Sequence, residues 1–366
     1  MQLTEFGGRL KRHATASGLT RHLVRIVSAL AKTGFWLAAY HYYGPKAFLY
    51  VSAAWLLALG AKDLTFWRIR LRRLHRPTQR TQALWLSIWL ELGLLAVRLA
   101  LTFGLSLLVG LFSPTVASVL VGLMLCTIFW SRETLNNLMR VYEVGALRIY
   151  IVMLGAIAGI GTIIACAETG RTAIVAAVAG LVVREAVQFF GMTMIVIAGR
   201  FGLRAPGDDV DEDEGGAEES VAVSGGREVR STWKLLIADN IVWSRWRLIQ
   251  FGTRYAATGL LGPFGGFASR MLFSYRKPGA YKHRETRLSA WKIAGMALLG
   301  ATSLTVLIMV AARWGLIHAL GLTLAASVFR LVAIVANTLL WRQLSPLVGM
   351  EGKIPSPIPQ ALRRKA

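Results

Sequence analysis

Long apolar runs, each bounded by polar or basic residues, recur along the chain. An α-helix rises 1.5 Å per residue, so about 20 apolar residues cross the roughly 30 Å hydrocarbon core of a bilayer. The pattern therefore predicts an all-α, polytopic membrane protein with about eight transmembrane helices. The runs cover residues 24–43, 47–67, 83–112, 115–131, 148–167, 172–199, 288–312 and 316–341.

The connections between these runs alternate in length and charge, which indicates an orientation. Those after the first, third, fifth and seventh runs are the short segments YYGPK, FSPT, AETGR and ARWG, whereas the others are longer and basic. Because Lys and Arg collect on the cytoplasmic side, we expect four helical hairpins with both termini in the cytoplasm. The most basic connection carries arginines that we expect to contact lipid headgroups: Arg68, Arg70, Arg72, Arg73, Arg76 and Arg80.

Tryptophans end three of the predicted spans on the basic side. Trp67, Trp130 and Trp341 each stand one or two residues before an arginine. Tryptophan is enriched where the membrane meets water, so we expect these three side chains to face the lipid headgroups.

The rest of the chain divides by composition. A basic N-terminal leader (1–23) precedes a six-helix transmembrane region (24–199). The segment 200–230 contains GDDVDEDEGGAEES, which is acidic and rich in Gly, and this predicts a disordered cytoplasmic linker. The remaining parts are an interfacial or re-entrant cytoplasmic segment (231–287), a two-helix transmembrane hairpin (288–341) and a cytoplasmic tail (342–366).

Composition and charge support a membrane location. Of the 366 residues, 55% are hydrophobic and 17% are charged, whereas about a quarter are charged in a typical soluble domain. The net charge is +23, but the basic residues flank apolar runs, which favours anionic lipid over nucleic acid as the partner. The abundance of Arg, Ala and Gly indicates a bacterium with a GC-rich genome. We therefore expect a multi-pass protein of the bacterial inner membrane.

The usual catalytic motifs are missing. The sequence has no GxxxxGK[ST], HExxH or GxSxG motif, and its six histidines do not cluster. Cys126 and Cys166 both lie in apolar runs without CxxC spacing. The sequence therefore predicts neither a metal site nor a cofactor, and it favours a protein that is not an enzyme.

Ionisable residues at mid-membrane depth are the sharpest functional signal. A charge at a helix centre costs about 2.5–3.5 kcal/mol on insertion scales unless it is paired, hydrated or bound to an anion. Three central arginines stand against two glutamates, and guanidinium groups are suited to phosphate or carboxylate. The candidate substrate-binding residues are Arg98, Arg184 and Arg330, with Glu91, Glu185, Gln188 and Asn337 on the same helices.

Three hypotheses follow for the function. The first is a transporter or flippase for an anionic, lipid-linked substrate, such as a precursor of an envelope lipid or polysaccharide. The second is a non-catalytic assembly or scaffold protein with membrane-protein partners. The third is an intramembrane transferase acting on a phospholipid or polyprenyl phosphate. In that case loops 68–82 and 274–287 bind diphosphate, and Asp239, Glu133 or Glu143 is the base.

Overall fold

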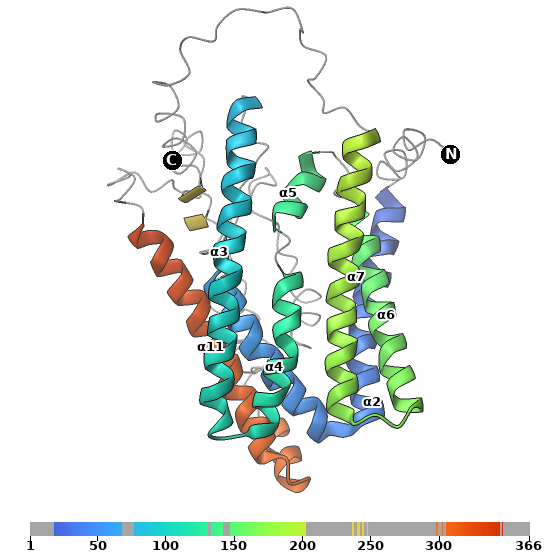
Figure 1. Cartoon of the computed structure of the whole chain (residues 1–366). Coiled ribbons are helices and arrows are strands. Elements are labelled where there is room, and N and C mark those ends of the chain that lie inside the picture. The colour runs from blue at the N-terminus through green and yellow to red at the C-terminus, as the bar shows by residue number, and fades with distance from the viewer. Residues whose placement is uncertain are drawn as a thin grey trace, which may run out of the picture. The chain divides into compact units, whose positions relative to one another are not determined.

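The described parts of the protein are helical. The computed structural model describes residues 18–67, 77–130, 133–141, 147–202 and 305–344, together with 236, 237, 240, 241, 244, 247, 298, 302 and 346. Within these residues no strand occurs. The helices are α2 (Gly18–Leu64), α3 (Pro77–Gly110), α4 (Pro114–Phe129), α5 (Glu133–Val141), α6 (Arg148–Glu168), α7 (Ala173–Gly202) and α11 (Ile317–Gln343) (Figure 1).

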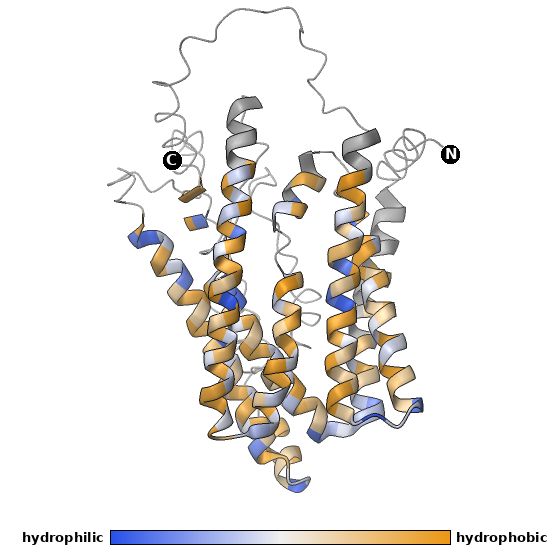
Figure 2. Cartoon of the chain, viewed as in Figure 1, coloured by the Kyte–Doolittle hydropathy of each residue, from blue (hydrophilic) through white to orange (hydrophobic). Residues whose placement is uncertain are grey.

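Six helical stretches of the described chain are long and apolar enough to cross a membrane. Figure 2 shows hydrophobic residues along most of their length, interrupted by hydrophilic bands in α3 and α7. Such helices indicate a multi-pass, all-helical membrane protein, as the sequence predicts. The stretches are Gly34–Leu64, Leu84–Gly110, Pro114–Asn136, Arg148–Glu168, Ala173–Ile197 and Ile317–Gln343.

The predicted number of eight transmembrane helices is not confirmed. The run 24–43 and residues 47–64 of the run 47–67 lie within α2, whose backbone is non-helical at Gly44 (φ 76°, ψ 171°). They contribute the single stretch Gly34–Leu64. Of the run 288–312, residues 298, 302 and 305–312 are described, and these are helical.

Three of the four predicted short connections contain turns, at residues 111–112, 169–170 and 314–315, and the fourth is a kink at Gly44 inside α2. Gly44, Gly170 and Gly315 have positive φ angles of 76°, 67° and 66°, a conformation that favours glycine because it has no Cβ. After the turn at 111–112, the Ser113 hydroxyl accepts a hydrogen bond from the Val116 N–H at 3.4 Å and caps the start of α4. Glycine and serine in the local sequence are therefore associated with the ends of these helices and with the kink in α2.

The chain forms two compact units, and the division passes through α2, α3 and α4. Unit 1 consists of Met1–Ala38, Trp67–Leu99 and Met124–Asp239. Unit 2 consists of Ala39–Phe66, Ala100–Leu123 and Asn240–Ala366.

In unit 1, α6 and α7 pack through glycines. A Cβ added at Gly159 would lie 2.8 Å from the carbonyl oxygen of Gly180, and one added at Gly180 would lie 3.0 Å from that of Gly159. A Cβ at Gly155 would lie 2.8 Å from the Arg184 carbonyl oxygen. The two backbones therefore approach closely, which small residues permit between membrane helices.

Replacing Gly159 with alanine should destabilise unit 1, because the new methyl group would collide with the backbone of α7. Overpacking of this kind costs about 1–3 kcal/mol. Gly161→Ala is the matched control on the same helix, since a Cβ there meets nothing within 4 Å. Thermal unfolding in detergent should show a lower midpoint for Gly159→Ala alone. Equal midpoints for the two variants would contradict the close packing.

In unit 2, the second part of α2 packs against α11. A Cβ added at Gly60 would lie 2.5 Å from the ring of Phe329, so the side chain of Phe329 rests directly on the α2 backbone. The Thr323 hydroxyl donates a hydrogen bond to the Leu49 carbonyl oxygen at 3.1 Å. This part of α2 carries a row of fully buried small residues: Ala53, Ala54, Ala58 and Ala61.

The prediction that three tryptophans face the lipid headgroups is wrong. Trp67, Trp130 and Trp341 are all buried, with at most 7% of their surface exposed. The indole N–H groups of Trp130 and Trp341 donate hydrogen bonds to acceptors inside the protein, namely Glu185 and the Phe66 carbonyl. A buried indole is stabilised by such an acceptor, and both Trp130 and Trp341 have one.

Several predicted domains lie wholly or mostly outside the described residues. This applies to most of the leader (1–23), the linker (200–230), the segment 231–287 and the tail (342–366). The cytoplasmic location of these segments, the disorder of the linker and the interfacial or re-entrant placement of 231–287 stay predictions.

Candidate functional site

A cluster of ionisable side chains lies inside unit 2. Asp63 near the end of α2 accepts a hydrogen bond from Arg330 Nε of α11 at 2.7 Å on its Oδ2 atom. Its other oxygen, Oδ1, accepts one from Arg247. The side chain of Asp63 is 4% exposed, and those of Arg247 and Arg330 are 13% and 14% exposed. We call these three residues the Asp63 cluster.

Each contact in the Asp63 cluster is charge-assisted. A hydrogen bond between two ionised groups is stronger than a neutral one, and burial strengthens it further. The guanidinium of Arg247 also lies 3.9 Å from the ring centroid of Phe66, within the range of a cation–π interaction. Two cationic groups are thus held at one buried carboxylate.

Asp63 is the functional candidate that the sequence analysis missed. Its signal is present, because GAKDL places an acid inside the apolar run 47–67. Counting three arginines against two glutamates omitted this third carboxylate, and it also omitted Arg247, which shares Asp63 with Arg330. An acid near the end of a predicted span is easily taken for a residue in water.

Asn337, two helical turns after Arg330 on α11, holds the end of α2. Its Nδ2 donates hydrogen bonds to the carbonyl oxygens of Leu64 at 2.7 Å and Phe66 at 3.0 Å. Trp341 Nε1 donates to the Phe66 carbonyl as well, at 3.0 Å. The last carbonyls of a helix need such donors, so Asn337 has a structural role in addition to any contact with substrate.

Arg184 and Glu185 of α7 form a buried pair in unit 1. Arg184 donates from Nε at 3.1 Å and from its terminal nitrogen at 2.9 Å to Glu185 Oε1. The second carboxylate oxygen of Glu185 accepts from Trp130 Nε1 at 2.9 Å. The Arg184 guanidinium lies 4.8 Å from the ring centroid of Phe35. Each of the two charges is therefore matched inside unit 1.

Glu91 and Arg98 of α3 are also buried in unit 1. Glu91 Oε2 accepts hydrogen bonds from the backbone N–H of Thr134 at 3.1 Å and from its hydroxyl at 2.5 Å. Thr134 lies in the first turn of α5, where a carboxylate is favoured by the helix dipole. Glu91 is also close enough to Arg98 for electrostatic attraction.

The predicted substrate-binding residues are thus divided between the units. Unit 1 holds Arg98, Arg184 and their glutamates, with the buried Gln188 packed against Gly155. Unit 2 holds Arg330 and Asn337. That these residues bind a substrate stays a prediction.

The residues expected at the membrane surface fall largely outside the described chain. Arg68, Arg70, Arg72, Arg73 and Arg76 lie in the gap between α2 and α3, and Arg80 lies in the first turn of α3. Asp239 and Glu143 are likewise outside, whereas Glu133 begins α5. Their roles at headgroups or in a transferase stay predictions.

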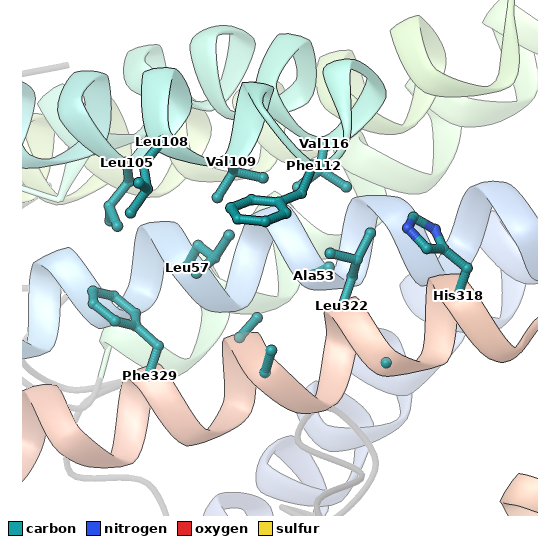
Figure 3. Close-up of a pocket in the computed structure, with 13 residues that line it drawn as sticks. Ala53, Leu57, Leu105, Leu108, Val109, Phe112, Val116, His318, Leu322 and Phe329 are labelled. Atoms are coloured by element: carbon teal, nitrogen blue, oxygen red, sulfur yellow. The ribbon is translucent and has the colours of Figure 1, made fainter.

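An apolar pocket of about 500 Å³ lies within unit 2. It is lined by α2, α3, α11 and the start of α4, through residues such as Leu57, Leu105 and Val116. Figure 3 shows His318 toward one end and Phe329 toward the other. The volume is in the range of about 300–1,000 Å³ that is typical of small-molecule sites.

Among the described residues, no group of three or more His, Cys, Asp or Glu is placed to hold a metal ion. Comparison of the chain with protein-family models, with curated proteins and with solved structures finds no match.

Proposed function

We propose that this multi-pass membrane protein is a transporter or flippase for an anionic, lipid-linked substrate, such as a precursor of an envelope lipid or polysaccharide. The Asp63 cluster carries the proposal. Ionisable residues inside membrane helices are rare and commonly mark the path of a substrate or ion. Here two guanidinium groups meet at one site, and guanidinium binds phosphate or carboxylate through two parallel hydrogen bonds.

Asp63 allows a substrate anion to be exchanged for a carboxylate of the protein at the two guanidinium groups. In the absence of substrate its carboxylate satisfies Arg330 and Arg247, which keeps the buried cations paired. An arriving anion offers the same kind of oxygen atoms and competes with Asp63 for the guanidinium groups. The arginines then alternate between an internal and an external partner. In the bound state the displaced Asp63 carboxylate takes up a proton or a water molecule, because a bare buried charge is costly.

The proposal is tested by reconstitution of the purified protein into phosphatidylcholine vesicles. A trace of phosphatidic acid with a fluorescent tail is added, and dithionite quenches the outward-facing fraction. The protein should accelerate loss of the protected signal. Arg330→Gln should slow translocation about ten- to hundredfold, the equivalent of about 1.5–3 kcal/mol for one charge-assisted hydrogen bond.

Arg313→Gln is the matched control, since Arg313 is an exposed arginine of the same unit. It should translocate the probe at the wild-type rate. The same rate with and without protein would overturn the proposal, and so would equal effects of the two substitutions.

We further propose the orientation expected from the charge pattern: four hairpins, both termini in the cytoplasm, in the inner membrane of a bacterium. The positive-φ turns at Gly44 and Gly170 and the basic gap 68–76 support it.

Single cysteines in a background without Cys126 and Cys166 should report this orientation. Cysteines at 44, 170 and 314 should react with a membrane-impermeant maleimide added to intact cells. Cysteines at 75 and 215 should react only after the membrane is opened. Labelling of 75 from outside would invert the orientation. Within the predicted interfacial or re-entrant segment 231–287, residues 255–273 are apolar. Labelling of 281 from outside would show that they cross the membrane.

An assembly or scaffold protein is the second candidate, and the buried pair in unit 1 favours it. Arg184 and Glu185 satisfy one another, with Trp130 and Phe35 around them, so this pair requires no bound anion. A buried network of this kind serves packing specificity in some proteins.

A further inference from the structure

The apolar pocket of unit 2 has the dimensions of one lipid chain. Along α11 it extends from His318 to Phe329. Eleven residues of helix rise about 16 Å, roughly half of the 30 Å hydrocarbon core of a bilayer. Each leaflet contributes about that depth of hydrocarbon.

The pocket adjoins the Asp63 cluster. Phe329, which lines the pocket, is the residue before Arg330. On α2, Leu57 lines the pocket and Asp63 follows six residues later, about 9 Å along the axis. Gly60 lies between them and packs against the ring of Phe329. An apolar volume and a cationic site thus follow one another along the same two helices.

We propose that the pocket holds one hydrocarbon chain of a lipid whose anionic headgroup binds Arg330 and Arg247. This inference rests on the proposed function and specifies its substrate as an amphiphile bound by both head and tail. A free sugar phosphate or a peptide would leave its polar groups unsatisfied against the apolar lining. A hydrocarbon chain needs no hydrogen bonds there.

Selectivity would come from the headgroup. Bilayer lipid is as apolar as the pocket lining, so transfer of a chain from bilayer to pocket changes the free energy little. Exchange of the Asp63 carboxylate for a lipid phosphate at the guanidinium groups is the step that distinguishes an anionic lipid from a zwitterionic one. The pocket then fixes where the bound lipid lies.

Gly321 allows the pocket to be filled without disturbing the helix. It lines the pocket, and a Cβ added there meets no atom within 4 Å. Gly321→Phe should therefore fold normally and place its ring in the pocket. Gly104→Phe is the matched control, since Gly104 lies in the same unit, is equally open and does not line the pocket.

The experiment uses the full chain in phosphatidylcholine nanodiscs that contain phosphatidic acid with a diazirine in one acyl chain. After illumination, mass spectrometry should locate the label on pocket residues such as Leu105 and Leu322. Gly321→Phe should reduce this labelling by on the order of tenfold, because the ring fills volume that the acyl chain would occupy and the pocket would be overpacked with both. Gly104→Phe should not. A probe with the same chain on a phosphatidylcholine head should label less, and Arg330→Gln should remove that difference.

Unchanged labelling in Gly321→Phe would overturn the inference, and so would label confined to exposed residues outside the pocket, such as Leu107. Equal labelling by the two headgroups would overturn the role of the arginines. Labelling of the pocket in a protein that translocates no lipid would overturn the proposed function but support the lipid site. Gly321→Phe could remove the labelling and still leave translocation intact. That result would show that the pocket is not where the transported substrate binds.

Discussion

Replacing Asp63 with alanine should sharply reduce the amount of folded protein in the membrane, because the change removes the carboxylate that Arg330 and Arg247 both bind. Breaking a buried ion pair on one side costs about 3–5 kcal/mol. That is a large fraction of the roughly 5–15 kcal/mol by which typical proteins are stable. The level and thermal midpoint of a fluorescent fusion extracted in mild detergent measure the effect.

Two further variants separate the charge of Asp63 from its shape. Asp63→Asn keeps an acceptor oxygen for Arg330 but loses the charge, so its level should lie between those of the wild type and Asp63→Ala. Glu168→Ala removes an exposed acid at the end of α6 and should leave the level unchanged. A normal level for Asp63→Ala would contradict a stabilising cluster and would favour a hydrated site.

Replacing Arg184 with alanine should also lower the level of folded protein, and replacing Glu185 in addition should restore most of it. The single substitution leaves the buried Glu185 carboxylate without the guanidinium that neutralises it, again at about 3–5 kcal/mol. The double substitution removes both charges, and apolar replacement of a whole buried pair is often neutral. The same fluorescent fusion measures the single and double variants.

The opposite outcome would change the interpretation of unit 1. Normal levels of Arg184→Ala with lost translocation would mean that Arg184 binds substrate, as the sequence predicts. Arg98→Ala extends the test to the second buried arginine of unit 1. Recovery in the double variant, together with no effect on translocation, would leave the Asp63 cluster as the site of substrate binding.

The sequence identifies some residues of the candidate site but not the residues that they contact. Arg98, Arg184 and Arg330 are recognisable from the sequence as charges inside apolar runs, and the structure shows Arg98 and Arg184 to be buried. The partners of Arg330 are not recognisable. Asp63 is 267 residues from Arg330 and 184 residues from Arg247. Such pairs form only when particular helix faces pack together, and the hydropathy pattern does not predict which faces do so.

The tryptophans likewise have positions that the sequence identifies and contacts that it does not. Their positions at the ends of apolar runs match those of interface residues, and Trp130 is nevertheless buried against a glutamate 55 residues away. A bulky side chain with one N–H group is stable either at the headgroups or beside a buried acceptor. Only tertiary packing decides between the two.

The sequence by itself determined that the protein is helical and embedded in a membrane, where its apolar runs lie and where its tight turns fall. These features follow from hydropathy and from glycine and proline, which act over a few residues. The tertiary structure decided which charges are paired, which glycines bring backbones into contact and where the apolar pocket forms. Those features depend on contacts between helices far apart in the chain, because a helix face has no partner until another helix packs against it.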